Sequence, residues 1–251
     1  MKNITLIGSG NVATHLGLSL INKGYKIKQV WSKEQKNADL LAKKVNSESI
    51  NNLNLIKDAD LYIVAVKDDV LESVIKHVDI NNIVHTSASK GIEIFKKKFK
   101  NYGVLYPLQT FNKEIDLDFS EIPICIEANN DLFERKLLTL GNTLSNKAII
   151  MNSEQRKQLH IGAVFACNFT TEMFSIAYTI LTKSNIDFKL LLPLINQTVK
   201  KIKTNKPSDF QTGPAKRKDQ KIIDDHINQI SNNQQKEIYK LISDSIIKNY
   251  D

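Results

Sequence analysis

A glycine-rich segment near the start of the chain has the residue types and spacing of a phosphate-binding turn. It reads Gly8-Ser9-Gly10-Asn11-Val12-Ala13 and connects a short apolar strand pattern to an apolar helical pattern. Gly8 permits a tight turn, Gly10 leaves the backbone open to a phosphate, and Ala13 lets the helix pack closely on the strand. An ordinary glycine-rich turn is the alternative. The strand-turn-helix context favours a dinucleotide site whose pyrophosphate faces the N–H groups of the helix start, formed by Gly8, Ser9, Gly10, Asn11 and Val12.

The choice of dinucleotide is made at the end of the second predicted strand, residues 25–31. NAD-binding turns carry an acidic residue there, which binds the ribose 2′-hydroxyl. This chain has Ser32-Lys33 at that place, with Glu34 next. A hydroxyl and an ammonium suit a 2′-phosphate, so the pair favours NADP(H), although Glu34 could shift the choice to NAD. A solvated serine and lysine on the surface are the alternative interpretation.

Three further segments, each following a later predicted strand, are candidates for contact with the ligand. Parallel sheets bind ligands beyond the carboxyl ends of their strands, so the segments after these strands should line one crevice. Val66 and Ser87 are therefore predicted to contact the cofactor. Each segment could instead only cap the helix that follows it. The segments are Val66-Lys67-Asp68-Asp69, Ser87-Ala88-Ser89 and Pro107-Leu108-Gln109.

A polar stripe on a long apolar helical pattern supplies the candidate catalytic groups. His160, Val164, Asn168 and Glu172 recur at every fourth residue and would share one helix face. His160 could donate a proton, and Asn168 could hold a carbonyl or imine while a hydride arrives. Against a partner subunit, the same polar groups would only satisfy one another. Asn168, in the middle of the stripe, is the strongest single candidate.

The order of predicted elements divides the chain into two domains. Strands and helices alternate over residues 1–152, which is typical of a doubly wound, mostly parallel α/β sheet. Residues 153–251 show helical patterns alone and predict a second, all-helical domain. Within it, residues 159–181 contain no lysine or arginine and are long enough to cross a bilayer. Their polar residues would be costly in lipid, which favours a helix buried in the second domain and against a partner subunit.

Composition narrows the function classes. The net charge is +8, but only three of the 35 basic residues are arginines, which does not favour a sequence-reading nucleic-acid interface. The two cysteines lie far apart with no CxxC or Cys/His cluster, so neither a disulfide framework nor a metal site is predicted. The first strand follows Met1 almost at once, which leaves no room for a signal peptide. We therefore expect a cytoplasmic protein acting on a small molecule.

Taken together, the motifs resemble the DUF2520 family, which is related to pyrroline-5-carboxylate reductase and ketopantoate reductase. The resemblance implies NADP binding, a helical domain that forms a homodimer, and oxidoreductase activity. Val164 stands where hydroxyacid dehydrogenases of the wider superfamily carry a lysine, so lysine-assisted chemistry is not expected. The family's Ser-Gly-Ser and Arg-Gly-Asp are replaced by Ser87-Ala88-Ser89 and Arg217-Lys218-Asp219. The matching segments are the glycine turn, residues 66–69, 86–89, 107–111 and 163–169, and Thr212-Gly213-Pro214 with Arg217 and Asp219.

The sequence thus predicts an NADP-dependent oxidoreductase that transfers hydride between NADP(H) and a small carbonyl or imine. The basic loop Gln211–Asp219 could clamp an anion or the substrate. One alternative is a non-catalytic NADP-binding sensor or assembly protein, which the missing lysine favours. A less favoured alternative is a methyltransferase that uses S-adenosylmethionine, since such enzymes normally carry an acid where Ser32-Lys33 stand.

Overall fold

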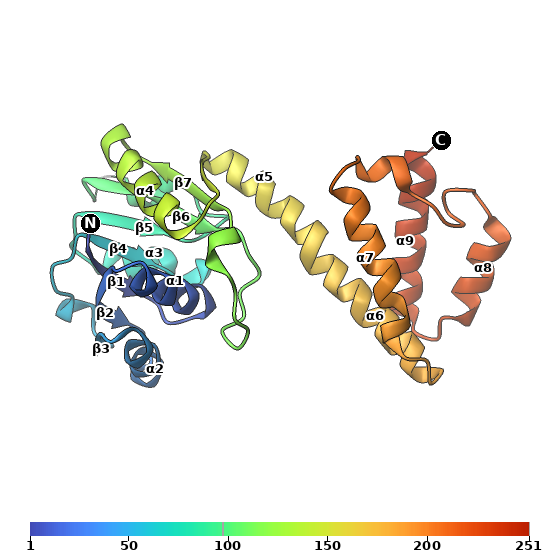
Figure 1. Ribbon diagram of the computed structural model, residues 1–251, viewed down its shortest axis with the longest axis horizontal. Helices are drawn as coiled ribbons and strands as arrows, with labels where there is room; N and C mark the ends of the chain where they lie inside the picture. The colour runs from blue at the N-terminus through green and yellow to red at the C-terminus, as the bar shows by residue number, and fades with distance from the viewer. Residues whose placement is uncertain (97, 251) are drawn as a thin grey trace. The chain divides into compact units, whose positions relative to one another are not determined.

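The computed structural model describes residues 1–96 and 98–250. By their contacts these residues form two compact units, Met1–Phe165 and Ala166–Asp251. Each unit has its own architecture, an α/β sheet in the first and helices in the second (Figure 1).

The first unit contains one mixed sheet of eight strands in the order β3-β2-β1-β4-β5-β6-β7-β8. All neighbouring strands are parallel except β6 and β7, which run antiparallel. The chain leaves β1 toward β2 and β3, then returns to place β4 on the other side of β1. The doubly wound, mostly parallel sheet is confirmed, and its switch point lies between β1 and β4. The strands are β1 (Asn3–Ile7), β2 (Lys26–Trp31), β3 (Glu48–Ile50), β4 (Leu61–Val64), β5 (Asn82–His85), β6 (Asn101–Pro107), β7 (Ile124–Ala128) and β8 (Ala148–Ile150).

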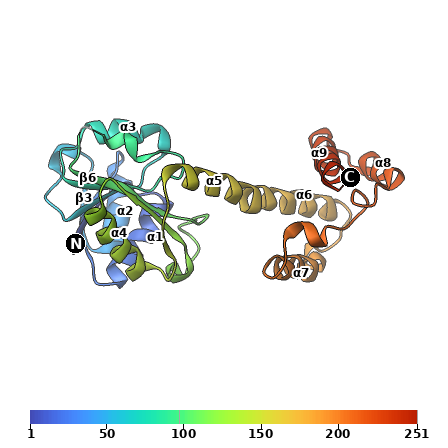
Figure 2. The ribbon, with the colours of Figure 1, turned by 90° about the horizontal axis from the view of Figure 1, so that it is seen from above.

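Helices cover both faces of this sheet. One face carries α1 (Asn11–Asn22), α2 (Gln35–Val45) and α4 (Asp131–Leu144), whose apolar residues join one core cluster. The other face carries α3 (Asp68–Lys76), which packs in a second cluster (Figure 2). All four residues of β4 are buried, as a strand covered on both faces requires.

The segment after β5 is held by aromatic contacts. It has a short 3-10 turn over Ile92–Phe95; Lys97 lies outside the described residues. Phe95 stacks on His85 with 5.5 Å between ring centroids, and Phe99 meets Phe95 edge-on at 5.6 Å. Both phenylalanine rings belong to the core cluster on the face of the sheet that carries α3, which holds the segment there.

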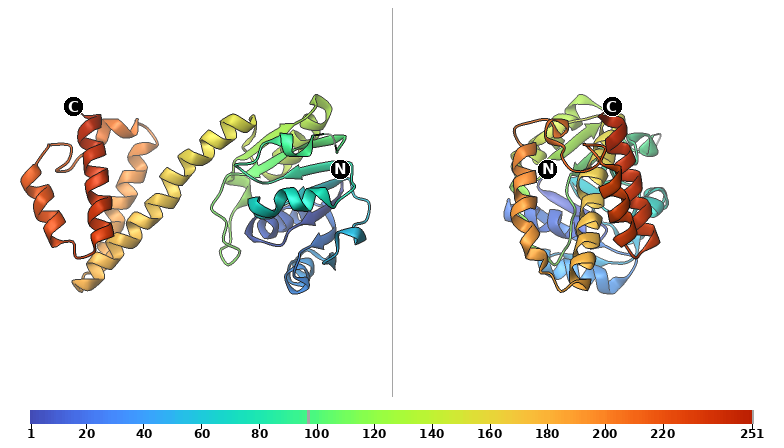
Figure 3. Two further views of the ribbon diagram at one scale, coloured as in Figure 1. Left: turned by 180° about the vertical axis from the view of Figure 1, so that it is seen from behind. Right: turned by 90° about the vertical axis from the view of Figure 1, so that its right-hand side faces the viewer.

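The second unit contains α6 (Thr170–Lys183), α7 (Leu192–Ile202), α8 (Gln220–Gln229) and α9 (Asn233–Asn249), drawn in orange to red in Figure 3. Pro193 lies in the first turn of α7, where a missing N–H costs nothing. A 3-10 turn over Phe188–Leu191 precedes it.

The long apolar helical stretch is less buried within the chain than the sequence analysis predicts. Ser153–Lys183 is long and apolar enough to cross a membrane by length and composition, and none of its most apolar window is buried within the chain. The prediction was burial in the second domain and against a partner subunit; within the chain alone the stretch is not buried, and Phe165 and Phe169 are 66% and 50% exposed.

A buried ion pair fixes the start of α5 (Ser153–Ala163) to the sheet. The Arg156 side chain is fully buried, and its Nη1 lies 2.6 Å from Oε2 of Glu127 on β7. Its Nη2 donates to the carbonyl oxygen of Lys90 at 2.5 Å, after β5. The Ser153 hydroxyl donates to the same Glu127 oxygen at 2.7 Å. One guanidinium therefore joins α5, β7 and the loop after β5.

We expect Glu127→Gln to lower the free energy of unfolding by about 3 kcal/mol or more, because Arg156 would remain buried without its counter-charge. Urea titration followed by circular dichroism measures the change. The matched control is Glu121→Gln, which removes an exposed ion pair with Lys147 and should have little effect. Equal stability of both variants would contradict a structural role for the buried pair.

Candidate cofactor and active site

The turn between β1 and α1 brings two strands and a helix together at Gly8. Gly8 has φ of +127°, a conformation that L side chains rarely adopt. Its N–H donates to the carbonyl oxygen of Trp31 at 2.8 Å. A Cβ added to Gly8 would lie 2.2 Å from the carbonyl oxygen of Ala65. Only glycine fits here, and the turn is held at the switch point of the sheet.

Gly10, two residues later, has free space around its Cα, whereas Gly8 has none. It is the N-cap of α1, and no side chain caps the helix. A Cβ added to Gly10 would meet nothing within 4 Å. The first turn of α1 also has no acidic residue that would repel an anion. The uncapped helix start thus faces open space, and these residues fit a dinucleotide pyrophosphate.

A cavity of about 760 Å³ lies beside this turn, within the first unit. Its charged lining consists of three lysines, Lys33, Lys67 and Lys113, and one carboxylate, Glu34. This positive balance suits a ligand with several phosphate charges. The predicted cofactor residues that line it are Gly8, Ser9, Gly10, Ser32, Lys33 and Val66.

Asn11 and Val12 take other roles in the structure. The Asn11 side-chain amide donates to the carbonyl oxygen of Phe111 at 2.9 Å, so it holds the segment after β6. Val12 packs against the core cluster of the sheet. Neither residue lines the cavity with Gly10. Both keep their places in the first turn of α1, where backbone groups rather than side chains meet an anion.

Ser87 organises the loop after β5. Its hydroxyl oxygen accepts from the N–H groups of Ser89 at 3.2 Å and Lys90 at 3.1 Å. Its own N–H donates to Nδ1 of His85 at 3.1 Å. Burial lowers the pKa of His85 to about 3, with the Arg156 charge adding to the effect, so this imidazole is neutral at physiological pH. The predicted cofactor residue Ser87 thus sits in a loop held by its own hydrogen bonds.

The candidate acid His160 has a partner that the sequence analysis missed. Nδ1 of His160 on α5 lies 3.3 Å from the hydroxyl oxygen of Tyr106 at the end of β6. Burial raises the pKa of Tyr106 to about 12, so its hydroxyl keeps its proton at neutral pH. When that hydroxyl donates to Nδ1, the neutral imidazole carries its hydrogen on Nε2. The tyrosine contact thereby leaves the hydrogen of the neutral ring on Nε2, as a hydrogen-bond donor.

Asn168 is exposed in a π-helical segment, Val164–Phe169, that joins α5 to α6. A π-helical turn holds more residues than an α-helical turn, so the predicted four-residue stripe is not one continuous α-helical face. Farther along, the hydroxyls of Ser175 and Thr179 donate to carbonyls one turn back in their own helix. Short π-helical segments occur frequently at functional sites.

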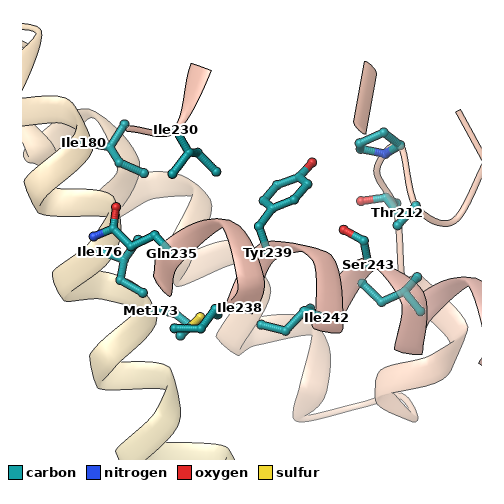
Figure 4. A pocket seen from close by; sticks show the side chains of 13 residues that line it. Met173, Ile176, Ile180, Thr212, Ile230, Gln235, Ile238, Tyr239, Ile242 and Ser243 are labelled. Atoms are coloured by element: carbon teal, nitrogen blue, oxygen red, sulfur yellow. The ribbon is translucent and has the colours of Figure 1, made fainter. Parts of the chain in front are cut away.

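The second unit has an apolar cavity of about 250 Å³ at the loop that was predicted to clamp an anion (Figure 4). Thr212, Pro214 and Ala215 of this loop line it, with a set of isoleucines and the polar tips of Gln235 and Tyr239. The Lys216 ammonium lies 3.3 Å from the centre of the Tyr250 ring, a cation–π contact. Within the described residues, no three His, Cys, Asp or Glu side chains gather as a metal site would require.

The sheet, its switch point and the glycine turn define a Rossmann-like dinucleotide-binding protein. The family model described as "NADP oxidoreductase coenzyme F420-dependent" matches residues 3–88, and "Domain of unknown function (DUF2520)" matches residues 122–246. A "putative NADP oxidoreductase" from Bacteroides fragilis is 38% identical, with 98% of each chain covered and a TM-score of 0.90. The chain therefore belongs to the NADP oxidoreductase family that combines these two domains, and its cofactor is NADP.

More distant structures share the fold. Pyrroline-5-carboxylate reductase from Streptococcus pyogenes is 14% identical, with 99% of this chain and 97% of that chain covered and a TM-score of 0.68. Imine reductase from Pseudomonas sp. is 16% identical, with 80% and 75% covered and a TM-score of 0.61. No curated protein sequence is significantly similar to the chain.

We expect Gly10→Asp to weaken NADPH binding at least about tenfold, because its carboxylate would meet the pyrophosphate. The fold should be retained, since the added Cβ has open space around it. Calorimetric titration gives the affinity, and the melting temperature checks the fold. Gly10→Ala, which adds a methyl group but no charge, is the control and should lose less affinity. An Asp variant with unchanged affinity would remove this turn from the cofactor site.

Proposed function

We propose that this oxidoreductase transfers hydride between NADP(H) and a small carbonyl or imine substrate. The observation that carries the proposal is the Tyr106–His160 pair, which offers a proton donor on α5 next to the end of β6. Reduction of a carbonyl or imine needs a hydride at carbon and a proton at oxygen or nitrogen. The names of two proteins with this fold, an imine reductase and a pyrroline-5-carboxylate reductase, agree with this substrate class.

NADPH, when bound, supplies the hydride. In the proposed mechanism, the glycine turn at Gly8–Gly10 holds the pyrophosphate, and Ser32 and Lys33 bind the 2′-phosphate. His160, as the imidazolium, gives its Nε2 proton to the substrate oxygen or nitrogen as negative charge develops there, and is left as the neutral imidazole. Tyr106 holds the ring at Nδ1 in both forms, accepting from the imidazolium and donating to the neutral imidazole. Asn168 holds the carbonyl or imine through its side-chain amide.

We expect His160→Gln and Tyr106→Phe both to lower kcat, the first by about 100-fold or more, as loss of a general acid does. The readout is NADPH oxidation at 340 nm with a panel of 2-keto acids and cyclic imines. Tyr102→Phe on the same strand is the control and should keep full activity. NADPH affinity should be unchanged in all three variants. Tight NADPH binding by the wild type without turnover of any panel member would favour the sensor or assembly role instead.

The second unit supports a further part of the proposal, a homodimer. Among its described residues only Ala215, Ile223 and Ser243 are buried. Leu190 and Leu241 are 72% and 69% exposed. So little burial leaves the unit short of a core of its own, and a second copy would supply the missing cover. We place this dimer in the cytoplasm, since both cysteines are free thiols and suit a reducing compartment.

We expect sedimentation equilibrium to give twice the chain mass, and Phe165→Glu with Phe169→Glu to shift the protein toward monomer. Both phenylalanines belong to the exposed apolar stretch, so charges there would oppose its burial in an interface. Leu132→Glu is the matched control, because Leu132 is an exposed leucine on α4 of the first unit. A wild-type protein that sediments as a monomer at micromolar concentration would refute the dimer.

A further inference from the structure

Lys113 reaches the cofactor cavity from a distant part of the sequence. It belongs to the segment that follows β6, yet it lines the cavity together with Gly8, Gly10 and Lys33. None of the ion pairs among the described residues involves Lys113. Within that part of the chain, therefore, no carboxylate forms an ion pair with its ammonium.

Three consecutive residues around Lys113 are hydrogen-bonded to α1. The Asn11 amide donates to the carbonyl oxygen of Phe111 at 2.9 Å. Nε2 of His15 donates to the carbonyl oxygen of Asn112 at 2.9 Å. The N–H of Lys113 donates to Oδ1 of Asn11 at 3.4 Å. The helix whose N-terminus faces the cavity thus also holds the backbone of this segment.

Aromatic packing makes the attachment rigid. His15 is buried, and its ring centroid lies 5.3 Å from that of Phe111. Phe111 in turn stacks on Phe119 at 6.1 Å. The backbone leading into Lys113 is held by these contacts, whereas its own side chain is exposed. Because this backbone is already held, less of its entropy is lost when the ammonium binds an anion.

The position of Lys113 indicates which phosphate group of the cofactor it could contact, the pyrophosphate or the 2′-phosphate. Besides the main cavity, Lys113 lines an adjoining cavity of about 220 Å³ with Ser9 of the glycine turn and Thr14 of α1. The rest of that lining is Glu114 and four residues of α2, Asn37, Leu40, Leu41 and Lys44. Lys33 follows β2, where the ribose carrying the 2′-phosphate is expected. Ser9 lines both cavities together with Lys113, which associates Lys113 with the glycine turn, where the pyrophosphate is expected.

We propose that Lys113 binds the pyrophosphate of NADP, and that Asn11 and His15 are positioning residues that hold it there. The proposal rests on the cofactor of the family but not on the substrate or the proposed reaction. A pyrophosphate contact is common to NADP and NAD, whereas a 2′-phosphate contact is made by NADP alone. The two assignments therefore predict different affinity changes.

We expect Lys113→Met to weaken NADP⁺ and NAD⁺ binding by the same factor, about tenfold, as loss of a charge-assisted contact does. Lys113→Arg should keep most of the affinity. Lys33→Met provides the contrast, because it should weaken the binding of NADP⁺ much more than the binding of NAD⁺. Lys136→Met, which removes an exposed lysine of α4, controls for the change in net charge. Calorimetry on the full-length protein measures all affinities.

His15→Phe tests the positioning role, since it keeps an aromatic ring but removes the donor to Asn112. It should weaken NADP⁺ binding about threefold in the wild type and have no further effect in the Lys113→Met background. Melting temperatures identify any variant that fails to fold. Unchanged affinity of Lys113→Met, or a loss confined to NADP⁺, would overturn the assignment. If the wild type bound neither dinucleotide, the cofactor site itself would be refuted, which is a distinct outcome.

Discussion

The close approach of Gly8 to the carbonyl oxygen of Ala65 is the constraint on which the site depends. It brings the end of β1 against the residue that follows β4, at the point where the chain reverses its direction across the sheet. The turn cannot move away without breaking its hydrogen bond to Trp31. As a result, α1 begins where three strands end, and its uncapped N-terminal residue, Gly10, lines the cavity.

Much of the first unit could be predicted from sequence because its signals are local. The continuous apolar run at Leu61–Val64 is buried on both faces, as its composition indicates. The glycine turn follows a strand and opens a helix, so its place at the switch point follows from chain order alone. Ser32 and Lys33 line the cavity for the same reason, since they end the strand next to β1.

What the sequence could not predict depends on contacts between distant segments. Tyr106 meets His160, and Lys113 reaches the glycine turn, only because the sheet and α5 bring them there. Asn11 looks like a cofactor contact from its motif, yet its amide is used to hold Phe111. The apolar helical stretch had the composition of a buried helix, but composition does not say which chain provides the cover. The spacing of apolar residues likewise does not distinguish the π-helical segment from an ordinary α-helix.

The two glycines of the turn are retained for different reasons. Gly8 has no room for any side chain, so its replacement would be selected against through folding, with or without a coenzyme. Gly10 has open space, so only the ligand keeps that position small. Descendants of this protein that abandon the coenzyme would be free to diversify at Gly10 while Gly8 stayed invariant. That asymmetry would distinguish, in a set of homologous genes, those that still encode a coenzyme-dependent protein from those that keep only the scaffold.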